Sequence, residues 1–313
     1  MKVRYTYRAR VTPANEQRLL AEWDAARWVW NRCVELDSKS RRAGVVRPQA
    51  GDLDRLLTRW RGEHQWLRAC SQNVQQQTVR DFCNARSDAW AIRKRGGRRG
   101  DPRFRSRRLS TPTLNVTRSG PFRLRNEKLL LPHGIVLRPV WSRDLPSEPS
   151  SVRISQDRLG RWFVSFVVER EIEPLPETGR AIGIDFGLKD VATTSAGPEF
   201  DLPHDHHGDR AARALLRYER QMARRRRPKG QAASNGYRQA KRRVARAKRK
   251  VADQRQDQAR KWAVRLVREF DQIAAEDLSV AFMLKNRSLA RTAADARIGS
   301  AKAALSDAAT KHG

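Results

Sequence analysis

The sequence is poor in the residues that build disulfides and zinc sites. It contains three cysteines, Cys33, Cys70 and Cys83, which are odd in number and form no CxxC pair. Three of its six histidines cluster in DLPHDHHGD at residues 201–209, but no matching second half of a zinc site accompanies them. We therefore expect the cysteines to be core thiols and the histidine cluster to be a polar loop.

Long apolar runs are also absent. No continuous apolar stretch approaches the roughly 20 residues that cross a bilayer, and the first residues lack the apolar core of a signal peptide. The sequence therefore predicts a soluble protein of the bacterial cytoplasm or nucleoid, without a membrane partner.

Acidic residues are scarce relative to basic ones. The chain has 34 Asp and Glu against 66 Lys and Arg, which gives a formal net charge of +32 and a pI near 11.4. Such a charge repels itself in a compact free protein, whereas phosphate contacts neutralise it and release counterions. The composition therefore indicates a polyanionic partner, with nucleic acid favoured over a membrane surface.

Two segments concentrate the basic residues. The stretch RKRGGRRGDPRFRSRR at 93–108 is predicted to be a loop because glycines and Pro102 break helices, and residues 220–252 carry 14 Lys and Arg without an acid. A solvated linker and a solvated helix face are the alternatives to phosphate contact. The predicted nucleic-acid contacts are Arg98, Arg99, Arg103, Arg224, Arg225, Arg226, Arg227, Lys241, Arg242 and Arg243.

The first half of the chain mixes strand and helix patterns. Residues 2–11 alternate apolar and basic side chains, as a half-buried strand does, and a helix with an apolar stripe follows Thr12 and Pro13. Further helices are expected around residues 53–60 and 74–89. From Thr113 to Glu169 the pattern is that of strands, ending in a hairpin across residues 157–160. These features predict a small β-barrel or sandwich with the helices of 13–92 inserted.

A second unit is predicted to begin at Arg180, after a proline-containing linker. Residues 181–186, 191–195 and 199–202 suggest an antiparallel meander of the kind found in RNase H-like folds. A long basic helix with an apolar stripe follows, and residues 270–276 then read as a buried strand.

Two acids end the predicted strands of this second unit. Asp185 lies in GIDFGLKD and Glu276 lies in IAAEDL. Carboxylate oxygens suit Mg²⁺, and paired ions can clamp the attacking and leaving oxygens of a phosphodiester. Gly187 would let a phosphate or a metal approach the backbone. Asp185 and Glu276 are therefore candidate catalytic metal ligands, with ordinary strand-end acids as the alternative.

Four segments together resemble the OrfB/TnpB proteins of bacterial insertion sequences, in that family's order and over nearly the whole chain. They are YRARVTPANEQRLLAEWDAARWVWN, PSSVRISQDRLGRWFVSFVVE, GIDFGLKD and IAAEDLSVAFMLKNRSLAR. The resemblance implies an RNA-guided DNA endonuclease, often labelled a transposase and related to the type V CRISPR effectors. In such a protein a guide RNA from the element pairs with target DNA. The resemblance assigns the first catalytic aspartate to Asp185 and the catalytic glutamate to Glu276.

The resemblance also implies an α+β multidomain organisation. A strand-rich, β-barrel-like wedge domain would comprise residues 1–12 and 110–172, with a helical recognition domain inserted at 13–109. A linker at 173–179 would lead to an RNase H-like (RuvC-like) α/β nuclease domain at 180–313.

The family pattern continues beyond what this sequence contains. It includes a further strand, a four-cysteine zinc ribbon and a third catalytic aspartate, whereas this sequence ends at Gly313 in a segment that reads as a weak helix. Asp295 and Asp307 match neither position and are expected to face solvent. We therefore expect an incomplete nuclease domain that uses Mg²⁺ if active, holds no Zn²⁺ and cleaves DNA poorly or not at all. A nuclease-dead RNA-guided DNA-binding repressor and a non-functional transposase fragment are the alternatives.

Overall fold

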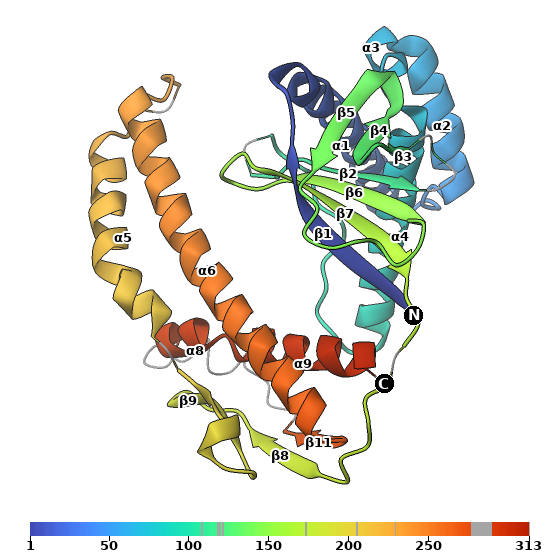
Figure 1. Ribbon diagram of the computed structural model, residues 1–313. Helices are drawn as coiled ribbons and strands as arrows, with labels where there is room; N and C mark the ends of the chain where they lie inside the picture. The colour runs from blue at the N-terminus through green and yellow to red at the C-terminus, as the bar shows by residue number, and fades with distance from the viewer. Residues whose placement is uncertain are drawn as a thin grey trace. The chain divides into compact units, whose positions relative to one another are not determined.

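The chain folds into two compact units (Figure 1). The computed structural model describes residues 1–107, 109–117, 120, 122–172, 174–204, 206–228, 230–276 and 290–312, without the side chains of residues 291 and 295. The N-terminal unit is Lys2–Arg170, and the C-terminal unit is Glu171–Gly313 together with Met1.

The N-terminal unit combines a curled antiparallel sheet with a group of helices. Its strands are β1 (Lys2–Arg10), β2 (Thr113–Thr117), β3 (Arg123–Arg125), β4 (Lys128–Leu131), β5 (Ile135–Pro139), β6 (Ser151–Gln156) and β7 (Trp162–Glu169). Its helices are α1 (Pro13–Arg42), α2 (Ala50–Glu63), α3 (Gln65–Arg68) and α4 (Gln72–Lys94), with a 3-10 turn η1 (Pro132–Gly134). All four α-helices therefore lie between β1 and β2 in the chain, as the sequence predicts.

The sheet of this unit has the strand order β2-β6-β7-β1-β5-β4-β3 in the described part of the chain. Strand β1 lies inside it, because it pairs antiparallel with β7 from Lys2↔Glu169 to Ala9↔Trp162 and with β5 at its other edge. The expected barrel or sandwich is one curled sheet, whose end strands β2 and β3 do not pair in the described residues. Strand β3 was missed, because it is three residues long and has only one apolar residue, Leu124.

The helices pack through the apolar stripes that the sequence predicts. Thr12 caps α1 by accepting a hydrogen bond from the Asn15 N–H, and Pro13 occupies the first turn. Helix α4 packs against α1, α2 and β2. The core between the helices is apolar and includes Trp30, Cys33 and Phe82. Cys33 and Cys70 are buried and Cys83 is half-buried, so the cysteines are core thiols as expected.

The C-terminal unit contains a smaller mixed sheet and longer helices. Its strands are β8 (Ala181–Asp185), β9 (Asp190–Thr194), β10 (Leu202–Pro203) and β11 (Gln272–Ala275), and a 3-10 turn η2 spans Pro198–Phe200. Its helices are α5 (His207–Arg224), α6 (Asn235–Glu269), α8 (Ala290–Ala296) and α9 (Ile298–His312). The described sheet has the order β10-β9-β8-β11, with β8 antiparallel to β9 and parallel to β11.

The core of this unit forms where α6 and α9 meet the sheet. Its buried residues include Ile184 of β8 and Phe186 directly after β8, Trp262 and Leu266 from α6, and Ile298 from α9. In Figure 1, α5 and α6 run as an antiparallel pair whose far end is the α5–α6 connection. None of the described residues of α5 is buried, and α6 is its main packing partner among the described elements.

Four predictions for this unit need correction. Residues 199–202 form the turn η2 and only the start of the short strand β10, because Pro198 begins a 3-10 turn that buries Phe200. The strand at 270–276 is largely exposed, because β11 lies at the edge of the described sheet. The polar loop at 201–209 instead contains β10, a buried His204 and the start of α5, which the sequence did not predict. The last helix packs firmly, with Ala301 and Leu305 in the core.

Candidate metal site and nucleic-acid surfaces

The parallel pairing of β8 and β11 brings the two candidate carboxylates to the same end of the sheet. Residue Ala275 lies opposite Ile184, and the Glu276 N–H donates to the Ile184 carbonyl oxygen at 3.3 Å. Glu276 therefore follows β11 at the level where Asp185 ends β8. Both residues are exposed. The structure thus brings together the two acids that the sequence singled out, about ninety residues apart.

The position of Asp185 is fixed by the core beneath it. Its neighbours Ile184 and Phe186 are both buried, so the carboxylate between them is directed out of the core. On the other side of β8, the Gly183 N–H donates to Ser195 Oγ at 2.9 Å, and the Ser195 N–H donates to the Gly183 carbonyl at 3.0 Å. Gly187 has a local packing reason to lack a side chain, since a Cβ there would lie 3.1 Å from the Asp190 carbonyl oxygen.

A lysine that sequence reasoning missed lies beside the carboxylate pair. The Lys302 ammonium of α9 donates to the Glu276 carbonyl oxygen at 2.6 Å. It also lies 5.1 Å from the ring centroid of Phe186, the residue after Asp185. The site therefore already contains one positive charge, and α9 supports the exposed end of β11. No sequence pattern distinguishes Lys302 from other helix-surface lysines, because the contact depends on how α9 packs.

The donor set fits a hard divalent cation of the magnesium type. Two exposed carboxylates supply oxygen ligands, and Mg²⁺ commonly uses one or two carboxylates while water or phosphate completes its coordination. Within the residues that the structure describes, no group of three or more His, Cys, Asp or Glu side chains gathers to hold a metal ion. Asp307 is exposed on α9, as predicted, and the side chain of Asp295 lies outside the described residues.

The histidine cluster follows β10, two strands from β8 in the described sheet, and is organised differently. His204 is buried, and its burial together with the neighbouring His206 lowers the pKa of His204 below its usual value. The rings of His204 and His206 lie 4.1 Å apart between centroids, and His206 Nδ1 lies 3.3 Å from an Asp209 oxygen. The burial of His204 between β10 and α5 is consistent with packing in this unit.

The predicted nucleic-acid contacts lie on two basic surfaces, one in each unit. The arginine loop, residues 95–107, follows α4 in the N-terminal unit, and the hairpin surface comprises the last residue of α5, the α5–α6 connection and the first turns of α6. All ten predicted side chains are exposed, and among the described residues none is paired with a carboxylate. The arginine loop carries Arg98, Arg99 and Arg103, and the hairpin surface carries Arg224, Arg225, Arg226, Arg227, Lys241, Arg242 and Arg243.

The hairpin surface has a defined tip. Arg225 donates to the Gly236 carbonyl at 3.4 Å, and Arg227 donates to the Ala232 carbonyl at 3.3 Å. Ser234 caps α6 by accepting from the Tyr237 N–H at 3.1 Å. The pairs Lys248–Glu219 and Arg249–Asp253 offset charge only below this tip. The described residues of the tip therefore present positive charge that no carboxylate pairs with, which favours a polyanion.

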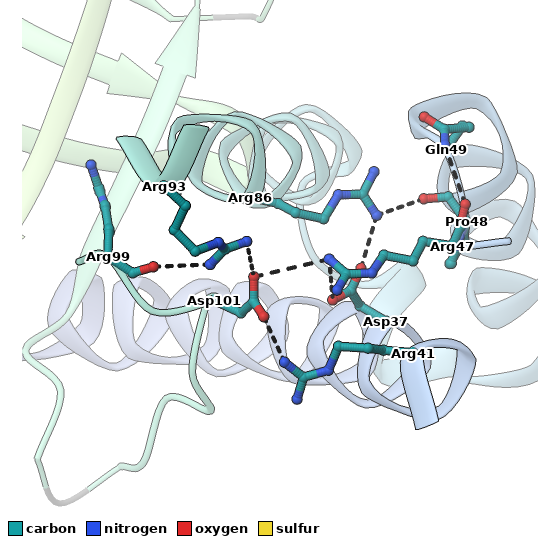
Figure 2. Close-up of polar contacts among 9 residues, drawn as sticks. All are labelled: Asp37, Arg41, Arg47, Pro48, Gln49, Arg86, Arg93, Arg99 and Asp101. Atoms are coloured by element: carbon teal, nitrogen blue, oxygen red, sulfur yellow. Dashed lines mark hydrogen bonds and ion pairs between the residues drawn. The ribbon is translucent and has the colours of Figure 1, made fainter. Parts of the chain in front are cut away.

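The arginine loop is held against the helices by contacts that sequence reasoning also missed. Asp101 lies at its centre and pairs with Arg41 and Arg93, as Figure 2 shows. A second acid, Asp37, pairs with Arg86 at 3.0 Å and with Arg47 at 3.7 Å. An aspartate inside a run of arginines was the only available signal for this role of Asp101.

No helix in the described residues is long and apolar enough to cross a membrane.

Comparison with known proteins gives a consistent picture. The family OrfB_IS605, described as "Probable transposase", matches residues 165–287. A protein of Streptomyces pristinaespiralis named "Putative RNA-guided DNA endonuclease" is 34% identical over 307 residues, which cover 94% of this chain and 72% of that protein.

Two solved structures align with much of the chain at low scores. A chain of a Cas12f1–sgRNA–target DNA complex has a TM-score of 0.42 and 9% identity, covering 100% of this chain and 88% of that one. A chain of a CRISPR–Cas12f ternary complex has a TM-score of 0.36 and 11% identity, covering 95% and 70%. The sequence relationship is decisive by itself: this chain belongs to the OrfB/TnpB family.

Proposed function

We propose that this protein binds a guide RNA from its insertion sequence and, through it, a complementary DNA target. The Asp185–Glu276 pair would be the metal-binding part of a RuvC-like endonuclease centre. The observation that carries the proposal is the placement of both carboxylates at one end of the parallel β8–β11 pair. The two exposed basic surfaces supply the phosphate contacts that RNA and DNA require.

The proposed domains follow the sequence expectation. Residues 1–12 and 110–172 would be the wedge domain, 13–109 the recognition domain, 173–179 a linker and 180–313 the nuclease domain. In this arrangement the guide would supply sequence specificity, whereas the protein would recognise backbone shape and a short flanking motif. Such a protein would act in the cytoplasm on the bacterial nucleoid.

Asp185 and Glu276 would hold Mg²⁺ through their carboxylate oxygens. When bound, such an ion activates water and stabilises the charge that develops on phosphate oxygens. Lys302 would hold the main chain at Glu276 and add a fixed positive charge near the scissile phosphate. The exposed site leaves room for a nucleic-acid strand to reach both acids.

A second candidate function is guided DNA binding without cleavage. It is favoured by the described residues, among which no group of three or more His, Cys, Asp or Glu side chains could hold a metal ion. It is also favoured by Lys302, whose charge beside Glu276 opposes the binding of a second cation. A protein of this kind would occupy its target and block transcription.

The first experiment tests guided binding and cleavage together. The protein is purified after expression with its native flanking DNA, and the bound RNA is sequenced. One discrete RNA species supports guided recognition, whereas a heterogeneous mixture of cellular RNA contradicts it. The complex is then incubated with matching DNA and Mg²⁺, and cut DNA separates the nuclease from the binding-only protein.

The metal role has its own readout, which does not depend on cleavage. In Asp185→Asn and Glu276→Gln, we expect Mn²⁺ affinity, measured by paramagnetic resonance, to fall about tenfold or more because half of the carboxylate set is lost. Asp307→Asn is the matched control, since it removes an equal charge from an exposed site in the same unit. Equal Mn²⁺ affinity in all three variants would contradict the metal assignment.

A further inference from the structure

The arginine loop has a fixed start, although its sequence is rich in glycine and charge. Gly96 adopts a left-handed backbone with φ of +80°, which favours glycine over residues with side chains. A Cβ on Gly97 would lie 2.6 Å from Ile92 Cγ2 and 3.0 Å from the Ile92 carbonyl oxygen. The Gly97 N–H donates to that same carbonyl at 2.9 Å. The chain therefore turns sharply against the end of α4 before the loop begins.

The middle of the loop is held by the carboxylate of Asp101. Arg41 of α1 donates to one oxygen at 2.7 Å, and Arg93 of α4 donates to the other at 3.0 Å. Arg47, in the α1–α2 connection, lies 3.9 Å from the Asp101 oxygen that accepts from Arg93. Asp101 thus joins three separate parts of the helical group, as Figure 2 shows. Its side chain is one-fifth exposed, and hydrogen bonds between ionised groups of this kind are stronger than those between neutral groups.

The main chain on both sides of Asp101 is held as well. The Arg93 guanidinium also donates to the Arg99 carbonyl at 2.9 Å, and Figure 2 shows the Arg99 side chain pointing away from Asp101. The Trp30 indole N–H donates to the Arg103 carbonyl at 2.9 Å. The loop therefore binds the helices through its backbone and one aspartate, while the side chains of Arg98, Arg99 and Arg103 remain exposed.

The end of the loop is fixed by a reciprocal pair of hydrogen bonds. Asn31 donates through Nδ2 to the Arg105 carbonyl at 3.0 Å and accepts from the Arg105 N–H at 2.8 Å. The Arg105 guanidinium lies over the Trp30 ring at 3.4 Å, and burial lowers the pKa of Arg105 from its usual value. Arg105 therefore serves packing, whereas the three exposed arginines earlier in the loop do not.

We propose that Asp101 is a positioning residue that holds Arg98, Arg99 and Arg103 in the arrangement that binds a nucleic-acid backbone. The proposal rests on the proposed function, because it takes the ligand to be a phosphodiester chain. A loop that is already ordered loses less conformational entropy on binding, so its phosphate contacts yield higher affinity. Asp101 lowers the local positive charge by one, but it fixes the positions of the three exposed arginines.

The substitution Asp101→Asn tests this proposal because charge and positioning predict opposite signs. Removing a negative charge from the protein alone strengthens binding to a polyanion. Loss of the two charge-assisted contacts frees the loop, and we expect the Kd for a mixed-sequence DNA duplex to rise about tenfold. Trypsin should also cut faster between residues 95 and 103. Asp101→Glu keeps the charge and should recover much of the affinity.

Two further variants separate positioning from a general effect on stability. Glu63→Gln is the matched control, because it removes one charge from the exposed Arg59–Glu63 pair of α2, outside the loop. A variant with Arg98, Arg99 and Arg103 replaced by Gln should bind weakly, and adding Asp101→Asn to it should not weaken binding further. Non-additivity of this kind is expected when one residue acts through the others.

The outcomes distinguish this proposal from the proposed function. If the wild-type protein binds neither the duplex nor an RNA hairpin, the proposed function fails and this inference fails with it. If the wild type binds but Asp101→Asn binds as well or better, only this inference is overturned. This inference is also overturned if Asp101→Asn weakens the binding of the triple variant as much as it weakens the binding of the wild type. If Asp101→Asn loses more affinity for one of the two ligands, DNA or RNA, that ligand is the one that the loop contacts.

Discussion

Glu22 on α1 is a buried acid with an altered proton affinity. Its side chain is only 5% exposed, and both of its oxygens accept from the Ser71 N–H, at 2.9 and 3.0 Å. Burial raises the pKa of Glu22 to about 7, although the Ser71 hydrogen bond and the charge of Arg61 act in the opposite direction. In the unfolded chain the pKa returns to the ordinary value of 4.5. Folding therefore favours the protonated acid.

This residue predicts a pH dependence of stability with a definite sign. Between about pH 4.5 and 7 the folded protein retains a proton that the unfolded chain releases, so its contribution to stability falls as pH rises. The wild-type protein should therefore lose unfolding free energy, measured by urea denaturation, as the pH rises from 5 to 8. In Glu22→Gln this loss should be smaller by about 1 to 3 kcal/mol. Glu63→Gln is the exposed control. Equal losses in wild type and Glu22→Gln would contradict the assignment.

Single residues also show where sequence reasoning reaches its limit. Asp185 and Glu276 could be proposed from the sequence because each ends an apolar strand segment, and the family resemblance assigns both. Lys302 and Asp101 could not, because their contacts depend on how a helix or a loop packs against residues distant in the chain. Strand-end acids have a local signature, whereas an ion pair between separate elements has none.

At the scale of elements, the sequence predicts those that have a clear period. Strand β1 shows the predicted alternation, with Val3, Tyr7 and Ala9 buried, and α1 buries its predicted stripe. The misses have physical reasons. Helix α5 buries no described residue although its apolar side chains gather on one face, and β11 reads as buried although its residues are exposed at a sheet edge. A short Ile-Ala-Ala run is apolar in either position.

The α5–α6 hairpin supplies a prediction at this scale. Replacing Arg224 and Arg226 by Glu leaves intact the tip contacts of Arg225 and Arg227. If the tip binds phosphates, nucleic-acid affinity should fall and the slope of log K against log salt concentration should flatten by about 2. Replacing Arg55 and Arg59 of α2 by Glu is the control, because it makes the same charge change elsewhere. An unchanged slope in the tip variant would remove the hairpin from the interface.

The whole molecule combines a net charge of +32 with few opportunities to neutralise it internally. Many of its ion pairs join residues three or four apart on one helix, such as Arg32–Glu35, Arg55–Asp52 and Lys261–Asp257. Exposed pairs of this type contribute little to stability. Repulsion among the remaining cations therefore opposes folding of the free protein.

This balance predicts how salt and nucleic acid change thermal stability. Raising NaCl from about 0.1 M toward 1 M shortens the Debye length from about 10 Å toward 3 Å, so the unfolding temperature of the free protein should rise. At low salt a nucleic-acid duplex should raise it further, because a ligand at about 100 times its Kd stabilises the native state by roughly 2.7 kcal/mol. High salt should remove this second effect, since it weakens phosphate contacts. Calorimetry of the full chain, with and without duplex at each salt concentration, separates the two contributions. An unfolding temperature that falls with salt in the free protein would mean that ion pairs outweigh repulsion, and that the excess charge has little effect on folding.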